Sequence, residues 1–185
     1  GATPEADKQD FKTFVTDPGF LPDEIKLYPC ALVSGTQLVQ KYREGAWQPY
    51  AKDELVDVLV QDVLATPPYV RISRMIRDIS ATDILVGNKH TNLRQMVEQE
   101  LAAEDVASHV QEIRFREINQ QQVRAVELTL QDFAYTTAVS DEHFLQWVTA
   151  DNKIAGFCRL SLPHWDKLTS GACDVSADEL LVQPG

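Results

Sequence analysis

The stretch DELVDVLVQDVLATPPYVRISRMIRD (residues 53–78) contains a helix, a stop signal and a strand in direct succession. Apolar side chains recur at helical spacing over residues 53–65, which predicts an amphipathic helix. Thr66-Pro67-Pro68 ends this helix, because two consecutive prolines cannot continue it. Residues 69–78 then alternate with a period of two, which predicts a strand.

The segment before this stretch predicts a matching strand and helix. Residues 25–33 form an apolar run that we interpret as one buried strand, with Pro29 at its end or in a bulge. A short helix over residues 37–44 follows, and another is expected before Asp17. Strand, helix and strand in this order predict a right-handed crossover and a parallel sheet.

The spacing of apolar residues changes in the segment after this stretch. A further helix is expected from Asn92 to about Ala103. Beyond Ser108, apolar and polar residues alternate at Ile113 and Phe115 and again over residues 126–130, which predicts strands with one solvent-exposed face. Residues 144–149 and 153–160 predict an antiparallel hairpin. We therefore predict an α/β segment over residues 1–106 and a mixed, largely antiparallel α+β segment over residues 107–185.

Composition excludes several classes of protein. The 185 residues are 44% hydrophobic, enough for a buried core, and no apolar run reaches the length of a membrane span. The net charge of −11 argues against a freestanding nucleic-acid binder, and we expect no DNA or membrane partner. The three cysteines form no C-x-x-C pair, so a cytoplasmic, reducing location is expected. The first residues show no secretion signal, and we expect a piece of a longer protein.

A basic cluster stands out against this acidic background. It consists of Lys26, Arg71, Arg74, Arg77, Lys89 and Arg94. Arg74, Arg77 and Tyr28 come late on predicted parallel strands, where ligands bind in α/β folds, and arginine suits phosphate groups. One interpretation is a site for an anionic ligand or an RNA backbone. The other is that these arginines pair with Asp78, Asp83 or Glu98 on a solvated face.

Histidines and aromatic residues leave two interpretations open. His90 lies in a polar loop before a helix N-terminus, where it could meet an anion or simply be solvated. Four aromatic residues could stack on bases or pack in the core or its rim: Trp47, Tyr50, Trp147 and Trp165. Cys30 is interpreted as a structural thiol, and the sequence contains no zinc-protease, phosphate-loop or nucleophile-elbow pattern. The sequence therefore assigns no catalytic residue and no metal ligand.

Several short runs occur in an order that resembles one family. They are PDEIKLYP (22–29), GTQLVQKY (35–42), LVD (55–57), PPYVRISRMIRDI (67–79), HTNLR (90–94) and RFRE (114–117). These runs resemble R-P-D-x-L-K-[LI]-Y-P, G-T-x-L-Y-x-L-W, L-V-D, P-P-W-x-R-[VI]-x-R-x-x-R-D-I, H-x-N-L-R and R-x-R-E-V of the catalytic subunit of Elongator. One such match is weak evidence, whereas a series in the same order is specific.

The resemblance implies both a fold and a function. Residues 1–106 would be the late strand–helix units of a radical S-adenosylmethionine (β/α) barrel, and residues 107–185 the linker and first strands of a GNAT-type acetyltransferase domain. The parent protein would be an acyltransferase that modifies the wobble uridine of tRNA in a carboxymethyl-type reaction, with a 4Fe–4S cluster, S-adenosylmethionine and acetyl-CoA. Elongator-type protein partners or a homodimer are further expectations.

The resemblance also implies roles for individual residues. Lys26, Arg71, Arg74, Arg77 and Lys89 would meet phosphates of tRNA or acetyl-CoA. The rim of the active site would contain Tyr28, His90, Asn92 and Arg94, with Tyr28 and the guanidinium groups of residues 71–77 facing one void.

The departures from the family predict that this chain alone is inactive. Cys30, Cys158 and Cys173 do not replace the cluster-binding cysteines, and the acetyl-CoA loop is missing, so no cofactor site is complete. Where some relatives have C-x-C-x-x-C, this sequence has Val110, Glu112 and Phe115, so no zinc site is expected. Two alternatives are a non-catalytic interaction module on the same scaffold and an unrelated small α/β enzyme.

Overall fold

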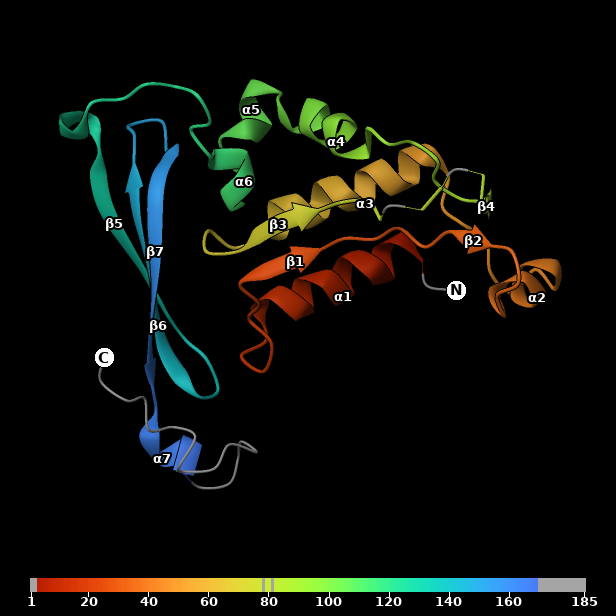
Figure 1. The fold of residues 1–185 in the computed structure, drawn as a ribbon, viewed down its shortest axis with the longest axis horizontal. Helices are drawn as coiled ribbons and strands as arrows, with labels where there is room; N and C mark the ends of the chain where they lie inside the picture. Colours follow the sequence, from red (N-terminus) through yellow and green to blue (C-terminus); the bar gives the residue numbers. More distant parts are fainter. Residues whose placement is uncertain (1–2, 78, 81, 170–185) are drawn as a thin grey trace. The chain divides into compact units, whose positions relative to one another are not determined.

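The computed structural model describes residues 3–77, 79–80 and 82–169 (Figure 1). They form two compact units: the first contains the described residues up to Asp17 and Pro22–Glu117, and the second contains Pro18–Leu21 and the described residues from Ile118 onward. The boundary that the sequence placed at residue 107 falls inside the first unit, because helix α6 (Ile113–Arg116) packs against strand β3 (Arg71–Arg74). The assignment of the two segments to a barrel and to an acetyltransferase domain stays a prediction.

The first unit alternates short strands with helices, as the sequence predicts for an α/β fold. Its other elements are α1 (Pro4–Thr16), β1 (Glu24–Lys26), β2 (Leu32–Val33), α2 (Leu38–Arg43), α3 (Lys52–Ala65), β4 (Ile84–Val86), α4 (Leu93–Leu101) and α5 (Glu104–Ala107). The helices α3 and α4 and the strand β3 lie where the sequence predicts them.

Strands β1 and β3 pair in parallel, with Ile25 opposite Ile72, which confirms the predicted parallel pair. Both isoleucines are buried, so the pair contributes to the core of the unit. The prediction of one strand over residues 25–33 is wrong. The chain leaves β1 after Lys26 and pairs again only at β2, which runs antiparallel to β4. Pro29 lies between the two strands, and its lack of a backbone N–H explains the interruption.

The helices bury the apolar faces that their periodicity predicts. Helix α3 packs against α1 on one side and α4 on another, and it buries Val58, Leu59 and Val63. Its first turn is capped by Glu54, whose carboxylate accepts a hydrogen bond from the Ala51 N–H at 2.9 Å. Helix α1 begins at the N-cap Thr3, whose hydroxyl accepts from the Ala6 N–H.

The predicted strand at Ile113 and Phe115 is wrong, because residues 113–116 form helix α6. The cause is the preceding Glu112, whose carboxylate accepts hydrogen bonds from two backbone N–H groups. One belongs to Phe115 at the start of the helix (2.8 Å), and the other belongs to Ile72 of strand β3 (2.6 Å). A side chain that caps the helix and binds the strand edge holds this segment in a turn, despite its alternating apolar residues.

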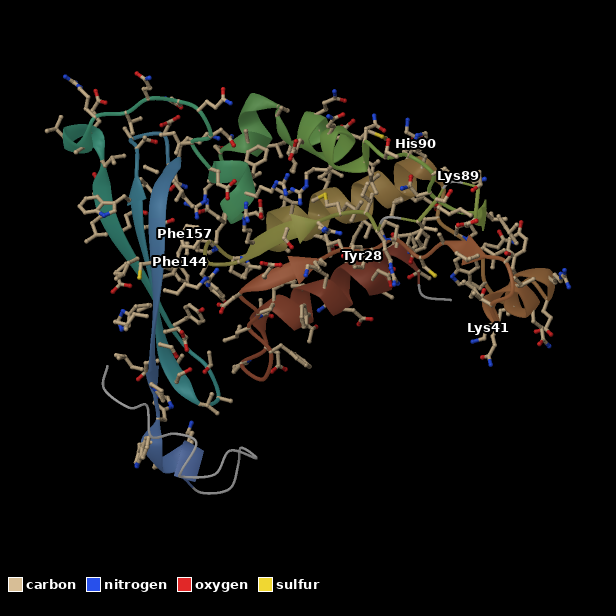
Figure 2. The ribbon with its side chains drawn as sticks, in the orientation of Figure 1. Tyr28, Lys41, Lys89, His90, Phe144 and Phe157 are labelled. Carbon is tan, nitrogen blue, oxygen red and sulfur yellow. The ribbon has the colours of Figure 1, made fainter. Side chains whose placement is uncertain are left out.

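The second unit is built on an antiparallel sheet in the order β5 (Thr129–Thr136), β6 (Ser140–Val148) and β7 (Ile154–Pro163). The predicted hairpin is confirmed by the β6–β7 pairing, and Phe144 on β6 is fully buried, with its ring 5.2 Å from that of Phe157 (Figure 2). The predicted strand over residues 126–130 is correct only from Thr129, because η1 (Ala125–Glu127) precedes it. A short helix α7 (Trp165–Thr169) follows β7.

Candidate functional site

The segment that leaves β1 lines a cavity of about 510 Å³ within the first unit. Helix α1, the loop before α3, α3 itself and Asn88 supply the other walls. The aromatic side chains that line it are Phe11, Phe14, Tyr28, Trp47 and Tyr50. This volume lies in the range of small-molecule sites, which are largely apolar with a few polar groups. The predicted rim residue Tyr28 therefore borders a site with room for a small ligand.

The charged groups that line this cavity are acidic. Asp7 and Asp10 reach it from α1, and Asp62 reaches it from α3. The Tyr50 hydroxyl donates a hydrogen bond to Asp7 Oδ2 at 2.8 Å. Burial and this bond to Asp7 raise the pKa of Tyr50 to about 12, so the phenol keeps its proton at neutral pH.

Asp62 is the most unusual group of the cavity. Its side chain is only 6% exposed, and its Oδ1 has no hydrogen-bond partner among the described residues. Burial and the neighbouring charge of Asp7 raise the pKa of Asp62 from its ordinary 3.8 to about 7, against a smaller opposing effect of Lys8. A buried carboxylate with an unsatisfied oxygen costs free energy, and this arrangement is enriched at functional sites.

A second, smaller cavity of about 80 Å³ has basic side chains in its lining. Arg77, Lys89 and His90 line it, and all three side chains are exposed. Figure 2 shows Lys89 and His90 side by side in the loop between β4 and α4. Asn88 orders this loop by accepting a hydrogen bond from the His90 N–H at 3.2 Å and donating one to the His90 carbonyl. The arrangement presents positive charge to an anion.

Gly87 allows this loop to approach the segment before β2. Its φ is +123°, and a Cβ placed there would lie 3.1 Å from the Cα of Ala31. Both the backbone conformation and the close approach require glycine at this position. The contact holds the basic loop against the segment after β1, so Pro29 and Asn88 line both cavities.

The structure does not bring Tyr28 and the guanidinium groups of residues 71–77 together at either of these two cavities. Tyr28 lines the acidic cavity, Arg77 lines the basic one, and Arg71 lines neither. The physical reason is that Arg71 forms an ion pair with Glu117, with 2.7 Å between Nη2 and Oε1. The alternative interpretation expected partners at Asp78, Asp83 or Glu98; Arg71 pairs instead with Glu117, whereas Arg94 lies 3.7 Å from the predicted Glu98.

The remaining predicted site residues also lie outside both cavities. Lys26 ends β1 and lies 3.7 Å from the Glu24 carboxylate. Arg74 ends β3 with an exposed side chain, and Asn92 is the exposed N-cap residue of α4. The ligand roles assigned to these residues stay predictions.

Arg94 binds the backbone at the edge of β3. Its guanidinium donates a hydrogen bond to the Ile72 carbonyl, while the Ile72 N–H donates to Glu112. Arg116, only 3% exposed, donates to the carbonyls of Gln111 and Pro68 at 2.8 and 2.9 Å. Burial lowers the pKa of Arg116 to about 10, so it remains charged at neutral pH. Side chains thus occupy the edge of β3 that is not paired with β1.

Asp7, Asp62 and Glu112 were missed by the sequence analysis. Asp7 lies on the polar helix α1, where nothing distinguishes it from its neighbours. Asp62 carried a signal, because it occupies the helical spacing of the buried Val58 and Leu59. A carboxylate within an apolar stripe marks a buried charge.

The described residues offer no complete metal site. No group of three or more histidine, cysteine, aspartate or glutamate side chains among them could hold a metal ion. Glu112 is engaged with backbone N–H groups, and Cys30 and Cys158 are free thiols. A 4Fe–4S cluster thus has no ligand set in this part of the chain. No described helix is long and apolar enough to cross a membrane.

Comparisons with known proteins place this chain in a family. Residues 22–103 match the Radical_SAM C-terminal domain. The tRNA uridine(34) acetyltransferase of Dehalococcoides mccartyi is 36% identical over 88% of this chain and 36% of its own length. Elongator complex protein 3 of Homo sapiens is 30% identical over 84% of this chain and 29% of its own length.

A solved structure agrees with these relatives. The archaeal Methanocaldococcus infernus Elp3 with an N-terminal deletion superposes with a TM-score of 0.79 at 31% identity, covering 87% of this chain and 39% of that one. The chain spans about a third or less of the curated relatives it matches and is a homologue of the part of Elongator subunit 3 that contains the Radical_SAM C-terminal domain.

Proposed function

We propose that the chain acts as the late-barrel part of a tRNA uridine(34) acetyltransferase, with the Arg77–Lys89–His90 cavity contacting tRNA phosphates. The observation that carries this proposal is the concentration of three basic side chains at one small cavity of a chain with a net charge of −11. Cationic side chains displace counterions from a phosphate backbone, which contributes most of the affinity of such contacts. The names of the relatives support tRNA as the ligand.

The parent protein would add what this part lacks. In this proposal a 4Fe–4S cluster and S-adenosylmethionine supply radical chemistry, and acetyl-CoA supplies the transferred group at a GNAT-type domain. The reaction takes place in the cytoplasm, with Elongator-type subunits or a second copy as protein partners. No step is assigned to a residue of this chain, because its described residues contain no ligand set for the cluster.

The test of the tRNA contact is a filter-binding titration of the 185-residue chain against tRNA at several salt concentrations. We expect affinity that falls with salt, and we expect the Arg77→Ala/Lys89→Ala variant to bind more weakly with a slope reduced by about one per lost phosphate contact. Lys12→Ala, an exposed lysine of α1 that lines neither cavity, is the single-charge control. Affinity that is independent of salt would refute the RNA contact.

The proposal also implies that this chain alone does not turn over. Acetyl-CoA hydrolysis in the presence of tRNA should not exceed the rate without protein, because the cluster and the acetyl-CoA loop belong to other parts of the family's fold. Measurable turnover by the isolated chain would contradict the proposal that catalysis needs these other parts.

A second candidate function, an interaction module, is favoured by the β5–β7 sheet. Leu130, Trp147, Leu160 and Leu162 expose about half of their side-chain surface, and the strand register places them on one face. Exposed apolar patches mark protein contacts. Sedimentation at increasing concentration tests the simplest case, a homodimer, which the Trp147→Ser/Leu160→Ser variant should weaken. A chain that stays monomeric at all concentrations excludes this case.

A further inference from the structure

The acidic cavity is opposite in charge to the cavity proposed to contact tRNA. Its charged lining groups are the carboxylates of Asp7, Asp10 and Asp62, and no described lysine or arginine lines it. Its walls include the aromatic rings of Tyr28, Trp47 and Tyr50. Carboxylates repel phosphates, whereas aromatic faces attract cations through their quadrupole. This combination selects a positively charged ligand.

Asp62 adds a second and independent requirement. Its side chain is 94% buried, and its Oδ1 accepts no hydrogen bond from any described residue. The neighbouring cation cannot satisfy it, because the Lys8 ammonium lies 2.6 Å from Asp57 Oδ2. A buried acceptor of this kind needs a donor, and an arriving ligand with N–H groups would supply it.

We propose that the cavity between α1, α3 and the Tyr28 segment binds an aliphatic amine, whose ammonium group donates to Asp62 while the aromatic rings enclose its carbon chain. A diamine fits best, because more than one carboxylate lines the cavity and a second ammonium can interact with a second of them. A quaternary ammonium has the positive charge but no N–H donor, so it cannot donate a hydrogen bond to Asp62.

The ionisation of Asp62 gives this site a predicted pH dependence. The ionisable groups that line the cavity or act on its groups are Glu5, Asp7, Lys8 and Asp10 of α1, Glu54 and Asp57 of α3, Tyr28 and Cys30 after β1, and Tyr50. With a pKa of about 7, Asp62 is largely protonated at pH 6 and largely ionised at pH 8. An aliphatic amine keeps its proton throughout this interval. Amine affinity should therefore rise about tenfold from pH 6 to pH 8.

Calorimetric titration of the 185-residue chain with 1,4-diaminobutane tests the proposal, with tetramethylammonium as the probe that lacks a donor. We expect saturable binding of the diamine that is at least about tenfold tighter than binding of tetramethylammonium. Asp62→Asn should weaken diamine binding at pH 8 by about tenfold and remove the pH dependence. Asp53→Asn, which removes a charge from the exposed start of the same helix, should bind like the unmodified chain.

Each other outcome overturns the proposal. Absence of diamine binding refutes the site, equal binding of both probes refutes the donor requirement, and unchanged binding by Asp62→Asn refutes the role of that carboxylate. If circular dichroism shows that Asp62→Asn does not fold, Asp7→Asn takes its place. It should weaken diamine binding, and unchanged binding would then refute the site. The tRNA titration concerns the other cavity, so either proposal can fail alone.

Discussion

Two buried carboxylates of the first unit, Glu112 and Asp62, differ in whether their oxygens have hydrogen-bond partners. Glu112 is 1% exposed and both of its oxygens accept backbone hydrogen bonds, from Ile72 and from Phe115. Asp62 is 6% exposed, and one of its oxygens has no partner among the described residues. Burial raises the pKa of both groups, but at Glu112 the backbone N–H groups oppose the rise.

The difference separates a structural carboxylate from a site carboxylate. Glu112 replaces a neighbouring strand at the edge of β3 and fixes helix α6 there, so its charge is compensated within the fold. Asp62 borders a cavity of about 510 Å³ and lacks such compensation. Substitution by an uncharged residue should therefore have opposite effects on stability at the two positions.

The largest expected effect is that of Glu112→Ala. It leaves the Ile72 and Phe115 N–H groups without an acceptor and removes a negative charge near Arg94, which should lower the free energy of unfolding by about 3–5 kcal/mol. Urea denaturation followed by circular dichroism measures this loss. Glu100→Ala, an exposed glutamate on α4, is the control. A loss below about 1 kcal/mol at Glu112 would mean that it is not structural.

Asp62→Asn should have the opposite sign at high pH. Because the folded-state pKa of about 7 exceeds the ordinary 3.8, the folded state binds more protons, and the unmodified chain loses stability as pH rises from about 4 to 7. This loss amounts to at most about 4 kcal/mol. The variant should lack it and be the more stable protein at pH 8. Urea midpoints at pH 5 and pH 8 check this, and parallel pH profiles of both proteins would contradict it.

Tyr50→Phe should have a smaller effect on the same cavity. The substitution removes the hydroxyl that donates to Asp7 at 2.8 Å while keeping the ring, and such a bond contributes about 1 kcal/mol. Tyr42→Phe on α2 is the matched control, because that tyrosine is exposed. In thermal melts we expect a lower melting temperature for Tyr50→Phe but not for Tyr42→Phe. Equal melting temperatures would show that the bond to Asp7 does not stabilise the fold.

The smallest effect is expected at Arg71. Its ion pair with Glu117 is partly exposed, so Arg71→Ala should cost less than about 1 kcal/mol and the cost should shrink at high salt. Unfolding in low and high salt measures it. A cost comparable with that of Glu112→Ala would place Arg71 among the structural residues.

The sequence predicts the elements whose local signals agree with their surroundings. Helix α3 has an apolar stripe and a double proline after it, and no other part of the chain is needed to place it. The alternating residues of helix α6 predicted a strand. This prediction failed because Glu112 accepts a hydrogen bond from Ile72, forty residues away, and no local sequence pattern indicates such a contact. Tyr28 was predicted late on a strand, but β1 ends at Lys26 and Tyr28 follows it, in a cavity lined also by side chains of α1 and α3.

The site was predictable only where a residue contradicts its local pattern. Asp62 interrupts a buried stripe and could have been found, whereas Asp7 and Asp10 look like any solvated face of a polar helix. Of the residues predicted to bind phosphates or to form the rim, the structure brings Arg77, Lys89 and His90 to one cavity. Ion pairing of Arg71 and engagement of Arg94 with β3 depend on tertiary contacts.

The most direct test of this account is a carbon-13 NMR titration of the Asp62 carboxyl group, with and without 1,4-diaminobutane. We predict a midpoint near pH 7 for the free chain and a lower midpoint with the amine, because a bound cation favours the ionised form. A midpoint near pH 4 that the amine does not move would contradict both the uncompensated burial of Asp62 and the proposed amine site.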